Sequence, residues 1–252
     1  MTLRPALFLL LASLLAGWGS TGDVDPMRTE KGREEARDAY IQLGLGYIQQ
    51  GASERAKVPL KKALEIDSSS ADAHAALALV FQLEMEPQLA DEHYRSAISQ
   101  RPGDARLLNN YGSFLFEQKR YGEAMERYKQ AAQDNLYPER SRVFENLGVT
   151  ALAMDKPEEA KKYFQRTLRL NSRQPRALLA MAEISYKELD YVAARGYYDS
   201  YSLISEQNAA SLLLGARLAK IFDDRDKSAS LGLQLKRLYP GTAEYKQYLS
   251  EQ

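Results

Sequence analysis

The chain has 252 residues, of which 44% are hydrophobic and 27% are charged, a balance that predicts a packed, soluble protein. Lysine plus arginine and aspartate plus glutamate number 34 each, so the composition does not favour a nucleic acid as partner. The absence of cysteine from the sequence excludes disulfide frameworks, thiolate catalysis and cysteine-based zinc sites.

The first nineteen residues predict a signal peptide. Arg4 precedes an apolar run from Ala6 to Ala16, which is too short to span a bilayer but has the length of a signal-peptide core. A polar stretch follows at once, which disfavours the alternative of a buried helix. We therefore expect a lipoprotein-like signal peptide over 1–19 and a flexible tether over 20–35.

The end of this leader resembles the bacterial lipobox, in which the residue after Leu15-Ala16-Gly17 is the cysteine that receives lipid. Trp18 stands at that lipidation position, and a thioether to lipid cannot form on it. Two interpretations remain open. Small residues at 17 and 19 could precede a cut at Ser20 that releases a soluble periplasmic protein, or Trp18 is a substitution in this copy of a lipoprotein. Membrane contact through a lipid anchor would require Cys at position 18.

The rest of the chain has a period close to 34 residues. One series of small residues has gaps of 34, 34, 36, 34 and 33, and comprises Gly44, Ala78, Gly112, Gly148, Ala182 and Gly215. A second series follows 12 residues later in the first five repeats and comprises Ala56, Ala90, Ala124, Ala160, Ala194 and Ala229. Such self-similarity predicts stacked helix pairs. We expect the two series to face each other across each pair, Gly44 against Ala56 and Gly112 against Ala124.

The pattern Leu43-Gly44, Tyr47, Ala56, Leu60 and Ala63 resembles the tetratricopeptide repeat (TPR). The resemblance implies an all-α fold, a right-handed superhelical solenoid of about six helix pairs with a C-terminal capping helix. The six repeats are expected over 36–241, at 37–70, 71–104, 105–140, 141–174, 175–207 and 208–241, and the last helix over 242–252.

In TPR proteins the first helix of each pair lines a groove that holds peptides or partner segments. Ile41, Leu45 and Ile48 fall on one helical stripe, while Leu43 and Tyr47 are expected to supply the core stripe of the same helix. The stripe therefore predicts an apolar trough for a partner, unless residues 24–36 or the edge of the array cover it. The predicted groove residues are Ile41, Leu45, Ile48, Ala75, Leu79, Leu83, Asn109 and Phe116.

Catalysis finds no support in the sequence. His74 and His93 lie 19 residues apart without a partner motif, and each is expected to be structural. The acidic cluster at 223–226 lacks the ligand spacing of a calcium loop, and no glycine-rich phosphate loop occurs. We expect no enzyme activity, no catalytic residue, no metal and no cofactor.

A closer resemblance covers nearly the whole chain. The stretches that carry it are 38–47, 108–112, 137–141 and 234–241, and together with the leader they resemble the PilF/PilW family of type IV pilus biogenesis proteins. The resemblance implies a pilotin on the periplasmic side of the outer membrane, which supports twitching motility by binding the secretin subunit and promoting its localisation and multimerisation. The alternative function is a generic periplasmic TPR scaffold in envelope assembly.

Overall fold

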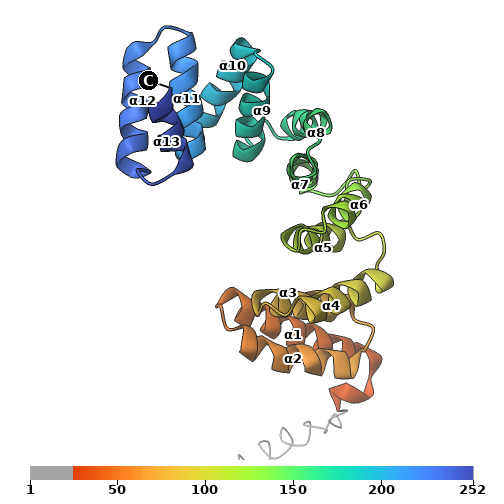
Figure 1. Ribbon diagram of the computed structural model, residues 1–252. Helices are drawn as coiled ribbons and strands as arrows, with labels where there is room; N and C mark the ends of the chain where they lie inside the picture. Colours follow the sequence, from red (N-terminus) through yellow and green to blue (C-terminus); the bar gives the residue numbers. More distant parts are fainter. Residues whose placement is uncertain (1–24, 252) are drawn as a thin grey trace, which may run out of the picture. The chain divides into compact units, whose positions relative to one another are not determined.

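The computed structural model describes residues 25–251, and every regular element within that range is a helix (Figure 1). The expected signal peptide, Trp18 and the first residues of the expected tether lie outside the described residues. The chain divides into two compact units, 1–86 and 87–252. The division falls inside the predicted second repeat, because α3 belongs to the first unit and α4 to the second.

The described residues of the first unit, 25–86, form one short 3₁₀ helix and three α-helices. They are η1 (Pro26–Arg28), α1 (Glu30–Gln49), α2 (Ser53–Ile66) and α3 (Ala71–Leu83). Helix α1 begins inside the expected tether, because the Thr29 side chain accepts a hydrogen bond from the Gly32 backbone and caps the helix. An ion pair between Lys31 and Glu35, one turn apart at 3.7 Å, supports this added first part of α1.

The second unit contains four consecutive helix pairs, preceded by α4 and followed by α13. Its helices are α4 (Pro87–Gln100), α5 (Ala105–Glu117), α6 (Tyr121–Ala131), α7 (Arg140–Ala153), α8 (Pro157–Leu170), α9 (Pro175–Lys187), α10 (Tyr191–Ser202), α11 (Ala209–Ile221), α12 (Arg225–Leu238) and α13 (Ala243–Ser250). Helix α13 packs against α11 and α12, where the Arg217 guanidinium pairs with the Glu251 carboxylate. The predicted all-α class is confirmed.

The predicted pairing of small residues needs a correction, because the nearest neighbour of each glycine in the first series is a large side chain. A Cβ atom built on Gly44 would lie 2.5 Å from Leu60 Cγ, and one built on Gly148 would lie 2.6 Å from Phe164 Cε1. Gly112 stands in the same relation to Tyr128. Each large residue follows the facing alanine by four positions, one helical turn, so the glycine makes room for a ring or a leucine rather than for alanine.

The turn after the first helix of each pair places one residue at positive φ. That residue is glycine only at Gly51, with φ of 72°, whereas Leu189 has φ of 65°. The next N–H closes a Schellman motif, for example Asp190 N to Ser185 O at 2.9 Å. The full series is Gly51, Met85, Lys119, Asp155, Leu189 and Asp223. For residues with a Cβ atom this conformation costs roughly 1–2 kcal/mol each.

Candidate partner-binding surfaces

The stripe predicted to form an apolar trough is largely used by packing within the first unit. Ile41 is only 4% exposed and contacts a cluster with Ala63 of α2 and Ala73 of α3. Leu45 and Ile48 are half-buried against the neighbouring core of α2 and α3. The expectation that packing leaves this stripe free for a partner is wrong, because α1 packs against both α2 and α3 and so uses two of its faces.

The exposed apolar residues of the first unit lie elsewhere. Leu43, predicted to lie in the core, is 48% exposed, whereas Tyr47 is half-buried beneath the Arg55 guanidinium at 4.4 Å. Leu79 and Ala75 on α3 are half-buried. Leu83, in the last turn of α3, is 55% exposed. Of the predicted groove residues in this unit, Leu83 is therefore the one most accessible to a partner.

In the second unit the two predicted groove residues have different surroundings. Asn109 is buried, and its Oδ1 accepts a hydrogen bond from Asn146 Nδ2 at 3.1 Å, which joins α5 to α7. Phe116 is half-buried and lines a pocket of about 290 Å³. The other lining residues come from four helices and are Ser113, Glu117, Tyr128, Asn146, Val149 and Arg176. Asn109 thus positions a helix, while Phe116 faces an open pocket.

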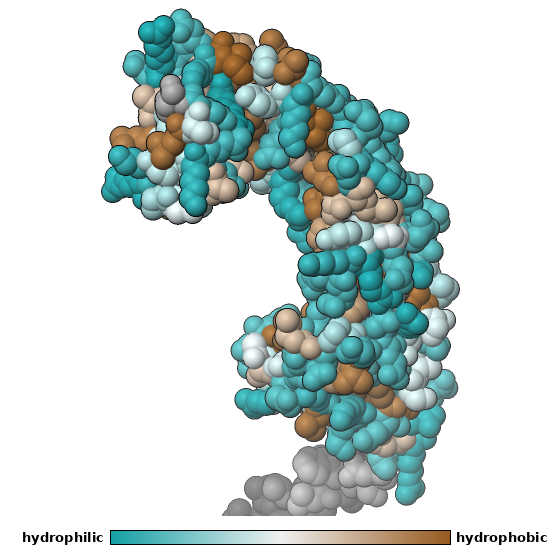
Figure 2. All heavy atoms as spheres, viewed as in Figure 1, coloured by the Kyte–Doolittle hydropathy of each residue, from teal (hydrophilic) through white to brown (hydrophobic). Residues whose placement is uncertain are grey.

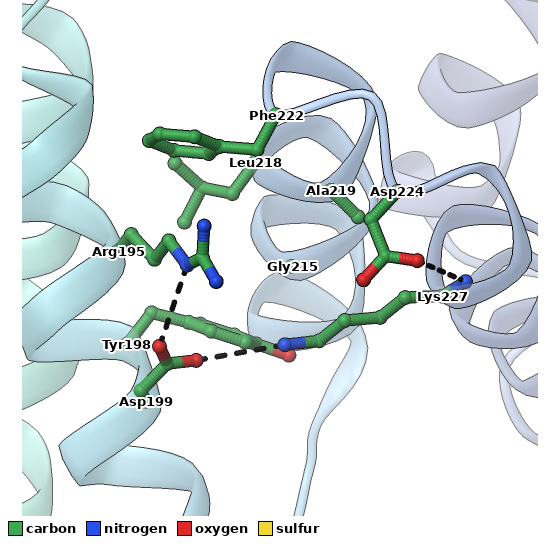
Figure 3. Close-up of a pocket in the computed structure, with 9 residues that line it drawn as sticks. All are labelled: Arg195, Tyr198, Asp199, Gly215, Leu218, Ala219, Phe222, Asp224 and Lys227. Atoms are coloured by element: carbon green, nitrogen blue, oxygen red, sulfur yellow. Dashed lines mark hydrogen bonds and ion pairs between the residues drawn. The ribbon is translucent and has the colours of Figure 1, made fainter.

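A second pocket, of about 160 Å³, lies among α10, α11 and α12 (Figure 3). Arg195 and Lys227 both pair with Asp199, at 3.6 and 3.5 Å, and the Asp224 carboxylate caps α12 by accepting the Lys227 backbone N–H. The Arg195 guanidinium also stacks 4.7 Å over the Phe222 ring. Sequence reasoning missed this pocket, although the spacing of Arg195 and Asp199 by four residues was a visible signal.

The described part of the chain, 25–251, holds no group of three or more acidic or histidine side chains that could bind a metal ion. No helix within those residues is both long and apolar enough to cross a bilayer. The face drawn in Figure 2 is mostly hydrophilic, with apolar residues in small scattered groups. Burial raises the pKa of the Glu145 carboxyl on α7, and nearby Arg176 and Arg142 lower it.

Models of the tetratricopeptide repeat match residues 38–70, 103–173 and 146–215. The type IV pilus assembly protein PilF of Pseudomonas aeruginosa is 63% identical over 251 residues, which cover 100% of both chains. An uncharacterized protein of Haemophilus influenzae is 30% identical over 135 residues, which cover 54% of this chain and 73% of that protein.

Solved structures give the same relationship. The structure of Pseudomonas aeruginosa PilF superposes with a TM-score of 0.85 at 65% identity, covering 88% of this chain and 100% of that one. The structure of PilW, described as a widely conserved type IV pilus biogenesis factor, has a TM-score of 0.71 at 26% identity and covers 84% of this chain and 98% of its own. These similarities, together with the repeat matches, confirm the superhelical TPR fold class.

Proposed function

Since the chain belongs to the family of type IV pilus assembly proteins that includes PilF of Pseudomonas aeruginosa, we propose that it acts as a pilotin. In this role it binds the secretin subunit of the outer membrane and promotes its localisation and multimerisation. It works in the cell envelope, on the periplasmic side of the outer membrane, and it acts by binding rather than by catalysis.

The observation that carries this proposal is the full-length identity of 63% to a type IV pilus assembly protein. The fold agrees with it, because stacked helix pairs expose an extended surface suited to protein segments. In the first unit, Leu83 supplies an exposed apolar side chain on α3, and Leu45, Ile48 and Leu79 are half-buried. Full burial of a leucine side chain against a partner contributes about 1.5–3 kcal/mol before the costs of association.

The direct test is a pull-down of secretin monomer with the mature chain, comparing wild type, Leu83→Asp and Val58→Asp. Val58 is 65% exposed and lies on α2, the second helix of the first pair. Its replacement introduces the same charge at another exposed apolar residue, which makes it the matched control. We expect Leu83→Asp to weaken binding about tenfold or more, since the charge must be desolvated in an apolar contact, and Val58→Asp to bind like wild type. Circular dichroism checks that both variants stay folded.

The outcomes test the binding surface at Leu83 and the pilotin role separately. Equal binding by wild type and Leu83→Asp removes the assignment to the first unit but leaves the pilotin proposal standing. Failure of the wild-type chain to bind secretin monomer, together with normal secretin multimers in cells that lack the protein, overturns the pilotin proposal. That result favours the alternative of a general periplasmic scaffold.

Whether the mature chain carries a lipid anchor is measured separately, by mass spectrometry. Trp18 cannot accept the thioether-linked lipid of a lipoprotein, so the chain with this residue is proposed to act without that anchor. Intact mass of the mature protein should then correspond to an unlipidated chain beginning near Ser20. A lipid-modified N-terminus contradicts this interpretation.

A further inference from the structure

Three arginines occupy the same position in consecutive repeats of the second unit. Arg106, Arg142 and Arg176 are separated by 36 and 34 residues, the same gaps that separate the small residues of the third, fourth and fifth repeats. Each therefore lies in the first turn of its helix, on α5, α7 and α9. The equivalent position in the first two repeats holds aspartate, at Asp38 and Asp72. The sign of the charge thus changes between the repeats of the two units.

The packing of the helices places the arginines in a row. Helix α7 contacts both α5 and α9, so the order along the unit is Arg106, Arg142, Arg176. The electrostatics agree with this order. Burial raises the pKa of Tyr137 against the opposing influence of Arg106 and Arg142, and it raises the pKa of the Glu145 carboxyl against that of Arg176 and Arg142.

Two arginines of the row are exposed although each has an acidic partner. Arg142 is 64% exposed and pairs with Glu139 at 3.6 Å, and Arg176 is 62% exposed and pairs at 3.6 Å with Glu145, which is itself buried. The Glu145 carboxylate thus lies behind its arginine. Each arginine lies in the first turn of its helix, where the helix dipole adds partial positive charge. Near Arg106, the Asp104 carboxylate caps α5 and pairs with Arg101 at 3.4 Å.

The row also borders the 290 Å³ pocket. Arg176 and Glu117 supply the charged groups of that pocket, and the half-buried side chains Phe116 and Val149 supply an apolar wall. A partner segment that places carboxylates on the arginines can therefore insert a neighbouring apolar side chain between α5 and α7. Charge and pocket together define the chemistry of the occupant.

We propose that this arginine row binds an extended acidic segment of a protein partner. Packed helices lie about 8–10 Å apart, so successive arginines are matched by carboxylates at that spacing. A polyproline II segment advances about 3.1 Å per residue with three residues per turn, so acidic residues at every third position lie on one face at about 9 Å intervals. The surface is separate from the residues of the first unit and does not rest on the secretin proposal.

The probe is a fluorescein-labelled synthetic peptide with glutamate at every third position, serine and proline between, and one leucine beside the last glutamate. Its binding to the full mature chain is followed by fluorescence anisotropy at low and at physiological salt. The matched variants are Arg142→Glu in the row and Arg169→Glu at the end of α8, both at exposed arginines. Arg142→Lys tests whether charge alone is sufficient.

Arg142→Glu should weaken binding about tenfold or more, Arg142→Lys by less, and Arg169→Glu by less than about twofold. The corresponding glutamine peptide should not bind, and removal of the leucine should weaken binding to wild type more than to Phe116→Ala. Equal losses in the Arg142→Glu and Arg169→Glu variants overturn the proposal, since they indicate unspecific attraction. Binding of phosphatidylglycerol vesicles through the same arginines, without peptide binding, also overturns it.

Discussion

Replacement of Gly148 by alanine tests the packing rule that underlies the repeats. A Cβ atom at this position would lie 2.6 Å from Cε1 and 2.8 Å from both Cδ1 and Cζ of the Phe164 ring, which is fully buried. Carbon atoms pack at about 3.5–4.0 Å, so the ring must move by most of an ångström. Overpacking of this kind costs about 1–3 kcal/mol. The gain of about 1 kcal/mol in helix propensity from Gly to Ala offsets part of that cost.

A matched substitution removes the propensity from the comparison. Gly196 lies inside α10 and is exposed, and a methyl group added there would have no atom within 4 Å, so Gly196→Ala should stabilise the protein by about 0.5–1 kcal/mol. Urea unfolding followed by circular dichroism should therefore give Gly148→Ala a free energy of unfolding about 1–3 kcal/mol below that of Gly196→Ala. If the two variants are equally stable, the close approach of the ring does not constrain this position.

Ile41→Ala should lower the free energy of unfolding by about 2–5 kcal/mol because the side chain is buried, whereas Leu43→Ala should change it by less than about 0.5 kcal/mol. If urea unfolding shows the reverse order, Ile41 is not a core residue and the predicted apolar trough stands. Leu189→Gly should stabilise by about 0.5–1 kcal/mol by relieving its positive φ, and a lower melting temperature refutes that reasoning. Burial raises the pKa of Glu183, so its ionisation penalises the folded state above the ordinary carboxyl pKa. Glu183→Gln should therefore stabilise at pH 7, and the gain should vanish as pH falls below about 4.5; a constant gain at all pH values speaks against burial as the cause.

Much of the fold follows from the sequence because its period is directly visible. The glycine and alanine series predict the helix pairs, and the structure has the all-α class that they imply. The period does not say which atoms meet, and a large residue one turn beyond each alanine turns out to fill the space beside Gly44, Gly112 and Gly148. Left-handed turns at residues such as Leu189 were also not predictable, since local sequence favours glycine or asparagine there.

The candidate surfaces were harder to predict for a physical reason. A first helix packs against its own partner and against the next first helix, so an apolar stripe such as that of Ile41 can be core rather than groove. Assigning faces from one helix alone misses this second contact. Phe116 lines a pocket, and its role in a partner-binding groove stays a prediction. Arg106 and Arg142 share one repeat position with Arg176.

The proposal that the chain assembles the secretin of a type IV pilus is tested most directly in a normally piliated bacterium from which its own PilF-type protein has been deleted. The chain with Trp18 and the Trp18→Cys variant, which restores a lipid acceptor, are expressed there, and secretin multimers are measured in the outer-membrane fraction. We predict multimers with the Trp18→Cys variant and fewer with Trp18, against monomers alone without the protein. Secretin that stays monomeric although both chains are folded and exported contradicts the proposal.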